Sequence, residues 1–468
     1  MSASANPAVE VIQQAHTVSP EITYLFTGIL CLMILTLAFE EKIHAKKSLI
    51  VLVFAVISLL LGGYFHLLPF GDIILPNGHH LGIPVYIPGI DWGVIAIIVG
   101  SSIFVDVTSK SGLFTYVAIK LTKMSKGDTL KLLWFYGIMT VVFSAVLNNV
   151  TAMIIVGSLT GVSLKKLGKD DKLLGFLLIE GLLTNIGGLL TLISSVPNII
   201  VGNAANISFM TFFIKASPFV VVATIITIFM GAKLFSIEKI QTEEERVSSL
   251  ERVESFNEND GIQSTNFFYF AALTLLLFVI TIATTSILPV IKDLGMGFVA
   301  IAFATLMLTR YKSTVDQFYK AIDWDLIGFF MALFVVINVM EHALVLDLIG
   351  TGINMIIGTT QSLFGTGALL VSAAVASSVT DNIPLAAMLA KILAANGTAS
   401  TSTLWWAVIF GANLGGNITP IGSASTLVAV TIIHKYKLPM SFVGFVKMAL
   451  PYAIVQLCLA LVYVLFFL

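Results

Sequence analysis

The sequence contains little charge and almost no cysteine. Lys, Arg, Asp and Glu together make up 11% of its 468 residues, and the formal net charge is −1. A chain without an excess of positive charge offers no basic surface to a nucleic acid, so we expect no nucleic-acid partner. The two cysteines, Cys31 and Cys458, lie in apolar stretches at opposite ends of the chain. Their number and placement exclude a disulfide framework and a Cys/His metal site.

Motifs of the common enzyme classes are also missing. The chain has no P-loop, no nucleophile elbow and no His/Glu metal pair. We therefore predict that the protein is not an enzyme and uses no cofactor other than a coupling ion, Na⁺ or H⁺. Its first 20 residues carry no Lys or Arg, so they lack the basic start of a signal peptide. We expect residues 1–21 to form a short polar tail outside the membrane.

Hydrophobic residues dominate the rest of the chain. They make up 57% of it, and the mean hydropathy of +0.99 is typical of an integral membrane protein. A helix needs about 20 apolar residues to span a bilayer. We predict an all-α integral membrane protein with about 11 transmembrane segments. Apolar segments run near 22–40, 48–68, 91–109, 211–234, 266–287, 295–309, 324–342 and 441–467, and polar motifs interrupt four more at 132–164, 173–203, 366–398 and 402–433.

The same motifs occur twice, about 230 residues apart. Three pairs carry the repeat: Asp91-Trp92 with Asp323-Trp324, Asn148-Asn149 with Asp381-Asn382, and Asn185-Ile186-Gly187-Gly188 with Asn413-Leu414-Gly415-Gly416. Paired polar breaks at matching positions in two halves indicate the binding site of a secondary transporter. We divide the chain into a first repeat half at 22–234, a charged cytoplasmic linker at 235–265 and a second repeat half at 266–468.

The distribution of Lys and Arg predicts that the two repeats are inverted. Both flanks of the stretch 132–164 are basic, with Lys131 directly before it and Lys165 directly after it. A simple span would carry one basic flank across the membrane, against the positive-inside rule, whereas a re-entrant hairpin would not. With the N-terminus outside, most of the 25 basic residues, Lys47 among them, become cytoplasmic. The second hairpin, 366–398, then enters from the opposite face.

Polar residues at the hairpin tips and in the two broken helices are the candidate binding residues. Asn oxygens suit a hard cation, although Asn also caps helices. Gly-Gly loops can present carbonyls to a cation or amides to an anion, or can simply allow close helix packing. The candidates at the tips are Asn148, Asn149, Thr151, Thr380 and Asn382; those in the broken helices are Asn185, Gly187, Gly188, Thr191, Asn198, Asn413, Gly415, Gly416, Asn417, Thr419, Ser423 and Ser425.

Asp381 is the acidic residue in the cores of these motifs. A carboxylate at membrane depth is expensive and indicates a functional site. Burial favours its protonated form and a bound cation favours its ionised form, so one group can exchange a proton for Na⁺. The alternative is a structural salt bridge from Asp381 to Lys391, ten residues further on.

Two further acids are open to two interpretations. Glu180, five residues before Asn185, could relay protons, or it could pair with Lys172 or Lys169 near the cytoplasmic end. Asp106 lies four residues before Lys110, a spacing that favours a surface ion pair on one helix.

These motifs together resemble the ion transporter superfamily, in the branch of the arsenite permeases, the melanosomal P protein and the D-type sodium/proton antiporters. The resemblance runs from about residue 22 to the end and rests on 39–44, Asp91-Trp92, 111–114, 144–152, Glu180, 185–188, 191–198, 379–386 and 411–427. It implies an elevator-type secondary transporter, usually a homodimer, whose two hairpins and two broken helices form a transport domain. It also places Glu180 at an acidic position of the arsenite and P-protein relatives.

The hairpin tips depart from this pattern in two ways. Dicarboxylate-transporting members carry Ser-Asn-Thr at each tip, whereas this chain reads Asn148-Asn149-Val150 and Asp381-Asn382-Ile383. The missing Thr hydroxyls disfavour citrate or succinate. Arsenite and antiporter relatives usually carry Asp-Asn at both tips, so Asn148 concentrates the charge on Asp381.

Two functions remain open from the sequence. The first is sodium/proton antiport, with Na⁺ held at Asn149, Asn185, Asp381, Asn382 and Asn413. The second is a permease for arsenite or another anion, an oxyacid or a small carboxylate. A multivalent oxyanion would call for a basic residue at the site, and Lys391 is the one that the motifs offer. Either function places the chain in a lipid bilayer, and we expect the bacterial inner membrane.

Overall fold

The computed structural model describes residues 18–68, 73–74, 78–84, 86–320, 322–358 and 362–468. Within these residues the fold is helical, apart from one antiparallel pair of two-residue strands, β1 (Ile73–Ile74) and β2 (His80–Leu81). Ten helices in this part of the chain are long and apolar enough to cross a membrane. The predicted all-α membrane fold is therefore confirmed. Most of the expected N-terminal tail lies outside the described residues.

The first half contains the helices before the charged linker. They are α1 (Pro20–Ala38), α2 (Glu40–Ile43), α3 (Lys47–Tyr64), α4 (Trp92–Ser109), α5 (Leu113–Ser125), α6 (Thr129–Val146), α7 (Asn149–Leu167), the 3₁₀ turn η1 (Asp170–Lys172), α8 (Leu173–Gly188), α9 (Val196–Ala204) and α10 (Phe209–Leu234). Asp91 begins α4 because its carboxylate accepts a hydrogen bond from the Val94 amide at 3.0 Å.

The second half repeats this order after α11 (Glu243–Glu254). It contains α12 (Thr265–Thr284), α13 (Ile291–Leu308), η2 (Thr309–Tyr311), α14 (Asp316–Tyr319), α15 (Trp324–His342), α16 (Val345–Ile357), α17 (Leu363–Val379), α18 (Asn382–Ala395), α19 (Thr403–Gly415), α20 (Ala424–Lys435) and α21 (Phe442–Phe466). Asp323 begins α15 as Asp91 begins α4, accepting from the Leu326 amide at 2.9 Å. The recurring Asp-Trp motif is thus a helix start.

Each half contains one helical hairpin and one broken helix. The chain turns at 147–148 between α6 and α7, and at 380–381 between α17 and α18. A non-helical stretch separates α8 from α9 at 189–195, and another separates α19 from α20 at 416–423. The polar motifs of the sequence therefore mark the helix ends, as predicted.

The two halves interlock. Helix α3 packs against α15 of the second half, and α13 packs against α4 of the first. The hairpin helix α7 contacts α20, while its counterpart α18 contacts α9. Each half thus supplies helices that complete the packing of the other, as expected for two repeats of one architecture.

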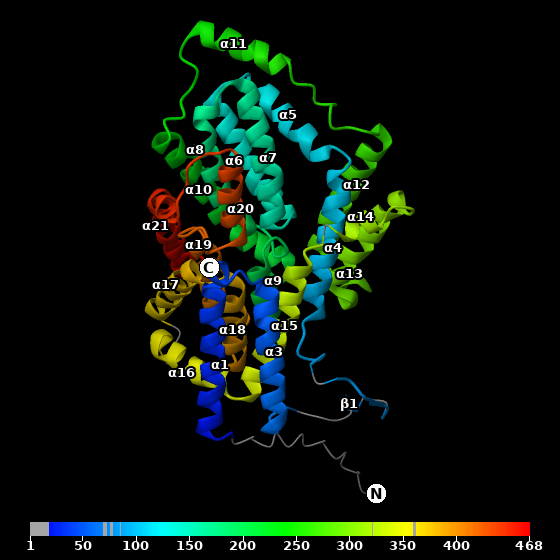
Figure 1. Ribbon diagram of the computed structural model, residues 1–468, viewed down its shortest axis with the longest axis vertical. Helices are drawn as coiled ribbons and strands as arrows, with labels where there is room; N and C mark the ends of the chain where they lie inside the picture. Colours follow the sequence, from blue (N-terminus) through cyan, green and yellow to red (C-terminus); the bar gives the residue numbers. More distant parts are fainter. Residues whose placement is uncertain (1–17, 69–72, 75–77, 85, 321, 359–361) are drawn as a thin grey trace, which may run out of the picture.

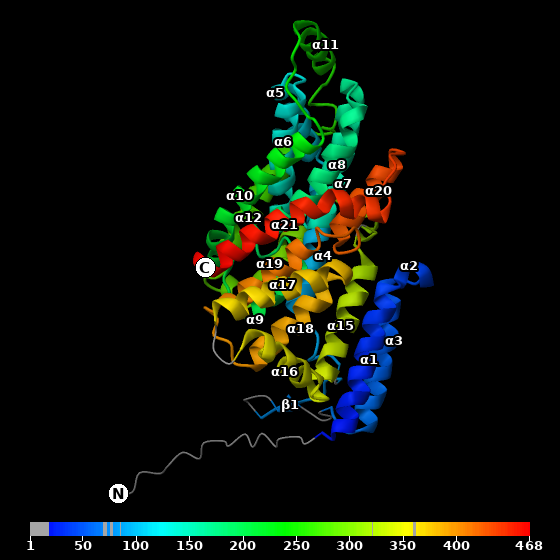
Figure 2. The ribbon, with the colours of Figure 1, turned by 90° about the vertical axis from the view of Figure 1, so that its left-hand side faces the viewer.

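The hairpins and broken helices lie between two ends of an elongated molecule. Helices α1 and α3 run side by side at one end, and α11 lies at the opposite end (Figures 1 and 2). Helices α8 and α19 are buried along almost their whole length, which explains why they are apolar on every side. Aromatic contacts such as Phe212 with Trp406, 5.2 Å between ring centroids, pack α10 against α19.

Helix α11 is bound to the base of the first hairpin. The Arg252 guanidinium donates to the Leu167 carbonyl at 2.6 Å, and the Lys166 ammonium donates to the Ser255 carbonyl at 2.8 Å. Lys169 also forms an ion pair with Glu245. The charged linker therefore contacts the end of α7 rather than extending freely into solvent.

Candidate functional site

A cavity of about 670 Å³ lies where the hairpin tips meet the broken helices. Its lining comes from the N-terminal ends of α7, α9, α18 and α20, from α4, and from the starts of α3 and α15. Eight of the predicted site residues line this cavity: Asn148, Asn149, Thr151, Asn185, Asp381, Asn382, Ser423 and Ser425. The helix breaks thus bring polar side chains of both halves to one place.

Side chains of the lining cap three of these helix N-termini. The Asn148 side chain accepts a hydrogen bond from the Thr151 amide at 2.8 Å, and Asp381 Oδ1 accepts from the Ile383 amide at 3.1 Å. Ser423 Oγ accepts from the Thr426 amide at 3.3 Å. Helix N-termini carry unpaired N–H groups and partial positive charge, which these oxygens partly satisfy.

The second oxygen of Asp381 is ion-paired. Its Oδ2 lies 2.8 Å from Lys47 Nζ, and the same ammonium lies 3.5 Å from Glu40 Oε1. The alternative of a salt bridge between Asp381 and Lys391 is wrong, because Lys391 pairs with Glu341 at 3.0 Å. The expectation that Lys391 is the cation available to the site is wrong as well. Lys47, expected in a cytoplasmic loop, takes that place.

Acidic residues dominate the charged lining of the cavity. Glu40, Asp106, Asp323 and Asp325 line it together with Asp381, whereas Lys47 is the single basic side chain among the described lining residues. Among the described residues, Asp106 does not form the expected ion pair with Lys110. Its side chain lines the cavity instead. Ser48 at the start of α3 donates a hydrogen bond to Asp325, so this carboxylate is held in place.

Hydrogen bonds between the two halves surround Asn185. Its amide nitrogen donates to Asn417 Oδ1 at 2.8 Å and to Ser423 Oγ at 2.9 Å. Its oxygen accepts from Ser425 at 3.0 Å and from the Asn149 amide at 3.3 Å. All three partners in the second half lie in the second broken helix, so Asn185 ties the two broken helices together.

Asn413 makes the equivalent bonds on the other side of the site. Its amide nitrogen donates to Asn198 Oδ1 at 2.8 Å, and its oxygen accepts from Ser195 at 2.7 Å. Asn198 in turn donates to the Gly188 carbonyl at 2.7 Å. Neither Asn413 nor Asn198 lines the cavity. The five expected Na⁺ ligands are therefore divided, with four at the cavity and Asn413 bonded elsewhere.

Serine and threonine hydroxyls hold each hairpin to the broken helix of its own half. Ser144 donates to the Thr184 carbonyl and Ser377 to the Ala412 carbonyl, each at 2.6 Å. Nearby, Thr191 donates to the Ala145 carbonyl and Thr419 to the Ser378 carbonyl, each at 2.5 Å. Thr191 and Thr419 therefore position the tips and do not themselves line the cavity.

The paired glycines allow close packing. A Cβ atom at Gly187 would lie 2.7 Å from the Val141 carbonyl oxygen, and one at Gly415 would lie 2.3 Å from the Ala374 carbonyl oxygen. A Cβ at Gly188 would meet the Asn149 amide at 2.6 Å, and one at Gly416 would meet Ser423. These glycines therefore allow the hairpins and broken helices to approach closely, and none of the four lines the cavity.

Glu180 lies apart from the cavity. Its side chain is fully buried, and Thr160 donates a hydrogen bond to one carboxyl oxygen at 2.6 Å. The alternative of an ion pair with Lys172 or Lys169 is wrong, because Lys172 pairs with Asp171 and Lys169 with Glu245.

A polar path that the sequence did not suggest runs from Asn417 to α10. Asn417 donates to Gln456 Oε1 at 2.8 Å, and Gln456 donates to Thr227 at 2.9 Å. Gln456 is an amide side chain within the otherwise apolar run of α21, and this isolated polar residue is the signal that could have identified the path.

A second cavity of about 700 Å³ adjoins the first. It lies between α1 and the second hairpin, is lined mainly by apolar side chains, and includes the predicted site residue Thr380. Glu40, Lys47 and Asp381 line both cavities. The ion-paired group therefore stands between the two cavities.

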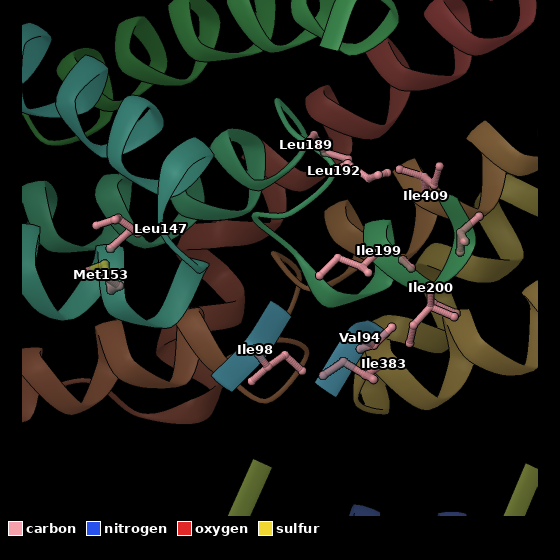
Figure 3. Packing of buried hydrophobic residues seen from close by; sticks show 14 of the residues in the cluster. Val94, Ile98, Leu147, Met153, Leu189, Leu192, Ile199, Ile200, Ile383 and Ile409 are labelled. Carbon is pink, nitrogen blue, oxygen red and sulfur yellow. The ribbon is translucent and has the colours of Figure 1, made fainter. Parts of the chain in front are cut away.

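Apolar side chains separate α4 from the hairpins and broken helices. Val94 and Ile98 of α4 share one buried cluster with Ile199 and Ile200 of α9 and Ile383 of α18 (Figure 3). These contacts of α4 are apolar, whereas hydrogen bonds join the hairpins to the broken helices.

Comparison with known proteins assigns the family. Residues 34–411 match the CitMHS family, described as citrate transporter. An uncharacterized transporter of Mycobacterium bovis is 28% identical over 381 residues, covering 80% of this chain and 86% of that protein. The P protein of Mus musculus is 24% identical over 452 residues, which cover 80% of this chain and 54% of the P protein.

Two solved structures share the fold. The YdaH transporter of Alcanivorax borkumensis, described as having an unusual topology, aligns with a TM-score of 0.57 at 11% identity and covers 95% of this chain and 98% of its own. Neisseria gonorrhoeae MtrF, described among antimetabolite efflux pumps, aligns with a TM-score of 0.52 at 12% identity, covering 97% and 96%. The family match extends over most of the chain, and the fold is shared with two transporters. The protein is therefore a multi-pass integral membrane secondary transporter that belongs to the CitMHS citrate transporter family of the ion transporter superfamily.

Proposed function

We propose that this protein is a sodium/proton antiporter in which Asp381 binds either Na⁺ or a proton. The observation that carries the proposal is the charge of the cavity, whose lining includes five carboxylates and one ammonium. An excess of carboxylates attracts cations and repels anions. Asp381 shares this lining with the neutral amides of Asn149 and Asn382, and oxygen ligands of this kind suit a hard cation.

Elevator-type alternating access fits the way the site is bonded. Asn185 and Asn413 join the two broken helices across the halves, and hydroxyls such as Thr191 hold the hairpins to them. Against α4, by contrast, these elements present an apolar surface (Figure 3). Such a unit can slide along α4 as one body without breaking hydrogen bonds, whereas the ion pairs of its second hairpin to α3 and α15, Asp381 with Lys47 and Lys391 with Glu341, would have to open.

The second candidate is transport of a small anion such as arsenite, another oxyacid or a carboxylate. Four helix N-termini and Lys47 at the cavity favour it, because both attract anions. The family description, citrate transporter, also names an anion. Two observations weigh against it: Lys47 is already paired with Asp381, and side chains of the chain itself cap three of these N-termini.

Flux measurements on the wild-type protein separate the two candidates. Proteoliposomes holding a pH gradient would receive Na⁺, Li⁺, K⁺, arsenite or citrate in turn. Sodium/proton antiport predicts that Na⁺ dissipates the gradient and that arsenite and citrate do not. Dissipation by an anion in the absence of Na⁺ would replace the antiporter with the permease.

We further propose a homodimer in a bacterial inner membrane with the N-terminus outside. The bacterial relatives and the distribution of Lys and Arg support the location and the orientation. The family resemblance supports the dimer.

A further inference from the structure

We infer that Lys47 is a tethered competitor of the transported cation, which pairs with Asp381 and shifts to Glu40 when a cation binds Asp381. This inference rests on the proposed cation transport. It assigns a role to Lys47, which lies outside the repeated motifs. Lys47 would lower the affinity of Asp381 for the cation, and its displacement would change the contact between the second hairpin and α3.

The atoms around Lys47 allow this exchange. Its Nζ lies 2.8 Å from Asp381 Oδ2 and 3.5 Å from Glu40 Oε1, so one ammonium reaches carboxylates on two different elements. Asp381 Oδ1 is engaged with the Ile383 amide. The oxygen that a cation would need is therefore the one that Lys47 contacts, and a cation and the ammonium compete for it.

The solvent exposure of the pair makes the exchange reversible. The side chains of Lys47, Glu40 and Asp381 are 29%, 22% and 15% exposed. Breaking a fully buried ion pair strands an uncompensated charge, whereas water that reaches a partly buried pair lowers the free-energy cost of opening it. Glu40 also offers the displaced ammonium a second partner, so no charge is left alone.

The same ion pair connects the second hairpin to a helix outside it. Lys47 is the first residue of α3, which packs along α15, whereas Asp381 lies at the tip between α17 and α18. Displacing Lys47 would remove this direct ionic contact between hairpin and α3. Cation binding would thereby release the hairpin tip from α3, which couples occupancy to transport. The other charged groups facing this space are Asp106, Asp323 and Asp325.

Substitution of Lys47 tests the competition. Lys47→Met removes the competing charge, so the Na⁺ concentration giving half-maximal dissipation of the pH gradient should fall about five- to tenfold. Lys47→Arg should stay near the wild-type value, because it keeps the charge. Lys391→Met is the matched control. This lysine is also ion-paired, lies on the hairpin that carries Asp381 and is away from both cavities, so its loss should leave the half-maximal Na⁺ concentration unchanged.

Glu40 supplies a test in the opposite direction. Glu40→Gln removes the second partner of the ammonium, so the half-maximal Na⁺ concentration should rise in the wild-type background. In the Lys47→Met background the same change should have a smaller effect, because only the general attraction of one cavity carboxylate for the cation is then lost.

The outcomes separate this inference from the proposed function. A wild-type protein that does not respond to Na⁺ would refute sodium transport itself. A wild-type response combined with an unchanged or higher half-maximal Na⁺ concentration in Lys47→Met would overturn only the role of Lys47. An equal effect of Glu40→Gln with and without Lys47 would also overturn it.

Discussion

Single side chains at the hairpin tips carry structural and chemical roles at the same time. Asp381 caps α18 through one oxygen and pairs with Lys47 through the other. Asn is isosteric with Asp and still caps helices well, and it already stands at the equivalent tip as Asn148. Asp381→Asn should therefore leave the fold intact, so a change in transport in this variant can be assigned to the lost charge.

The tip amides should be required for transport. Asn149 accepts from Ser144 at 2.8 Å and donates to Asn185, and Asn382 occupies the matching position in the second half. Asn149→Ala and Asn382→Ala should each abolish Na⁺-driven proton flux in proteoliposomes while the protein still purifies as a single folded species. Flux at the wild-type rate in either variant would refute a site built from both tips.

Glu180 should act as a structural residue. Because it bonds Thr160 and does not line the cavity, Glu180→Gln should keep Na⁺-driven proton flux within about twofold of wild type, since Gln can still accept that hydrogen bond. Glu180→Ala would leave Thr160 unpaired and should cost about 1–3 kcal/mol of stability. Loss of flux in the Gln variant, with a normal melting temperature, would instead assign the proton relay to Glu180.

At the scale of elements, the helix ends were predictable from the sequence and their partners were not. Asn, Gly and Ser interrupt otherwise apolar runs, and each interruption costs backbone hydrogen bonds in a membrane, so these patches marked the hairpins and broken helices correctly. Lys47 and Asp381, in contrast, are 334 residues apart, and no local pattern pairs α3 with α18. For Asp106 the helical spacing to Lys110 favoured a surface pair, but packing turns that side chain toward the cavity.

Close packing of the broken helices gives a prediction on stability. At Gly415 a Cβ would lie 2.3 Å from a backbone oxygen, so Gly415→Ala should destabilise the protein by about 1–3 kcal/mol and lower its melting temperature in detergent. Gly352→Ala is the control, because that helical glycine has open space around it and Ala favours helix. Equal melting temperatures for the Gly415 variant and wild type would contradict the packing role.

At the scale of the whole molecule, exchange of helices between halves places the site at the centre. Helix α3 packs against α15 of the second half, and α13 packs against α4 of the first. The cavity is lined by residues of both halves and therefore lies where they meet. The motif repeat predicted two similar halves. The repeat could not predict that α3 packs on the second half and α13 on the first. All these helices have apolar surfaces, and an apolar sequence pattern does not specify which helix packs against which.

The opposite entry sides of the hairpins can be measured by labelling. With Cys31 and Cys458, both exposed, replaced by Ser, single cysteines at Lys131 and Asp170 should react only from the cytoplasmic side. Cysteines at Leu363 and Ser400, at the base of the second hairpin, should react only from outside. Labelling of Lys131→Cys and Asp170→Cys from opposite faces would contradict the inverted repeats.

The most direct test of the account compares wild type with Asp381→Asn across pH 6 to 9. If Na⁺ and protons compete for Asp381, the half-maximal Na⁺ concentration of the wild type should rise as pH falls, because protonation removes the charge that binds Na⁺. Asp381→Asn should be folded and should show no Na⁺-driven proton movement at any pH. Sodium-driven proton movement that persists in Asp381→Asn would contradict the central claim.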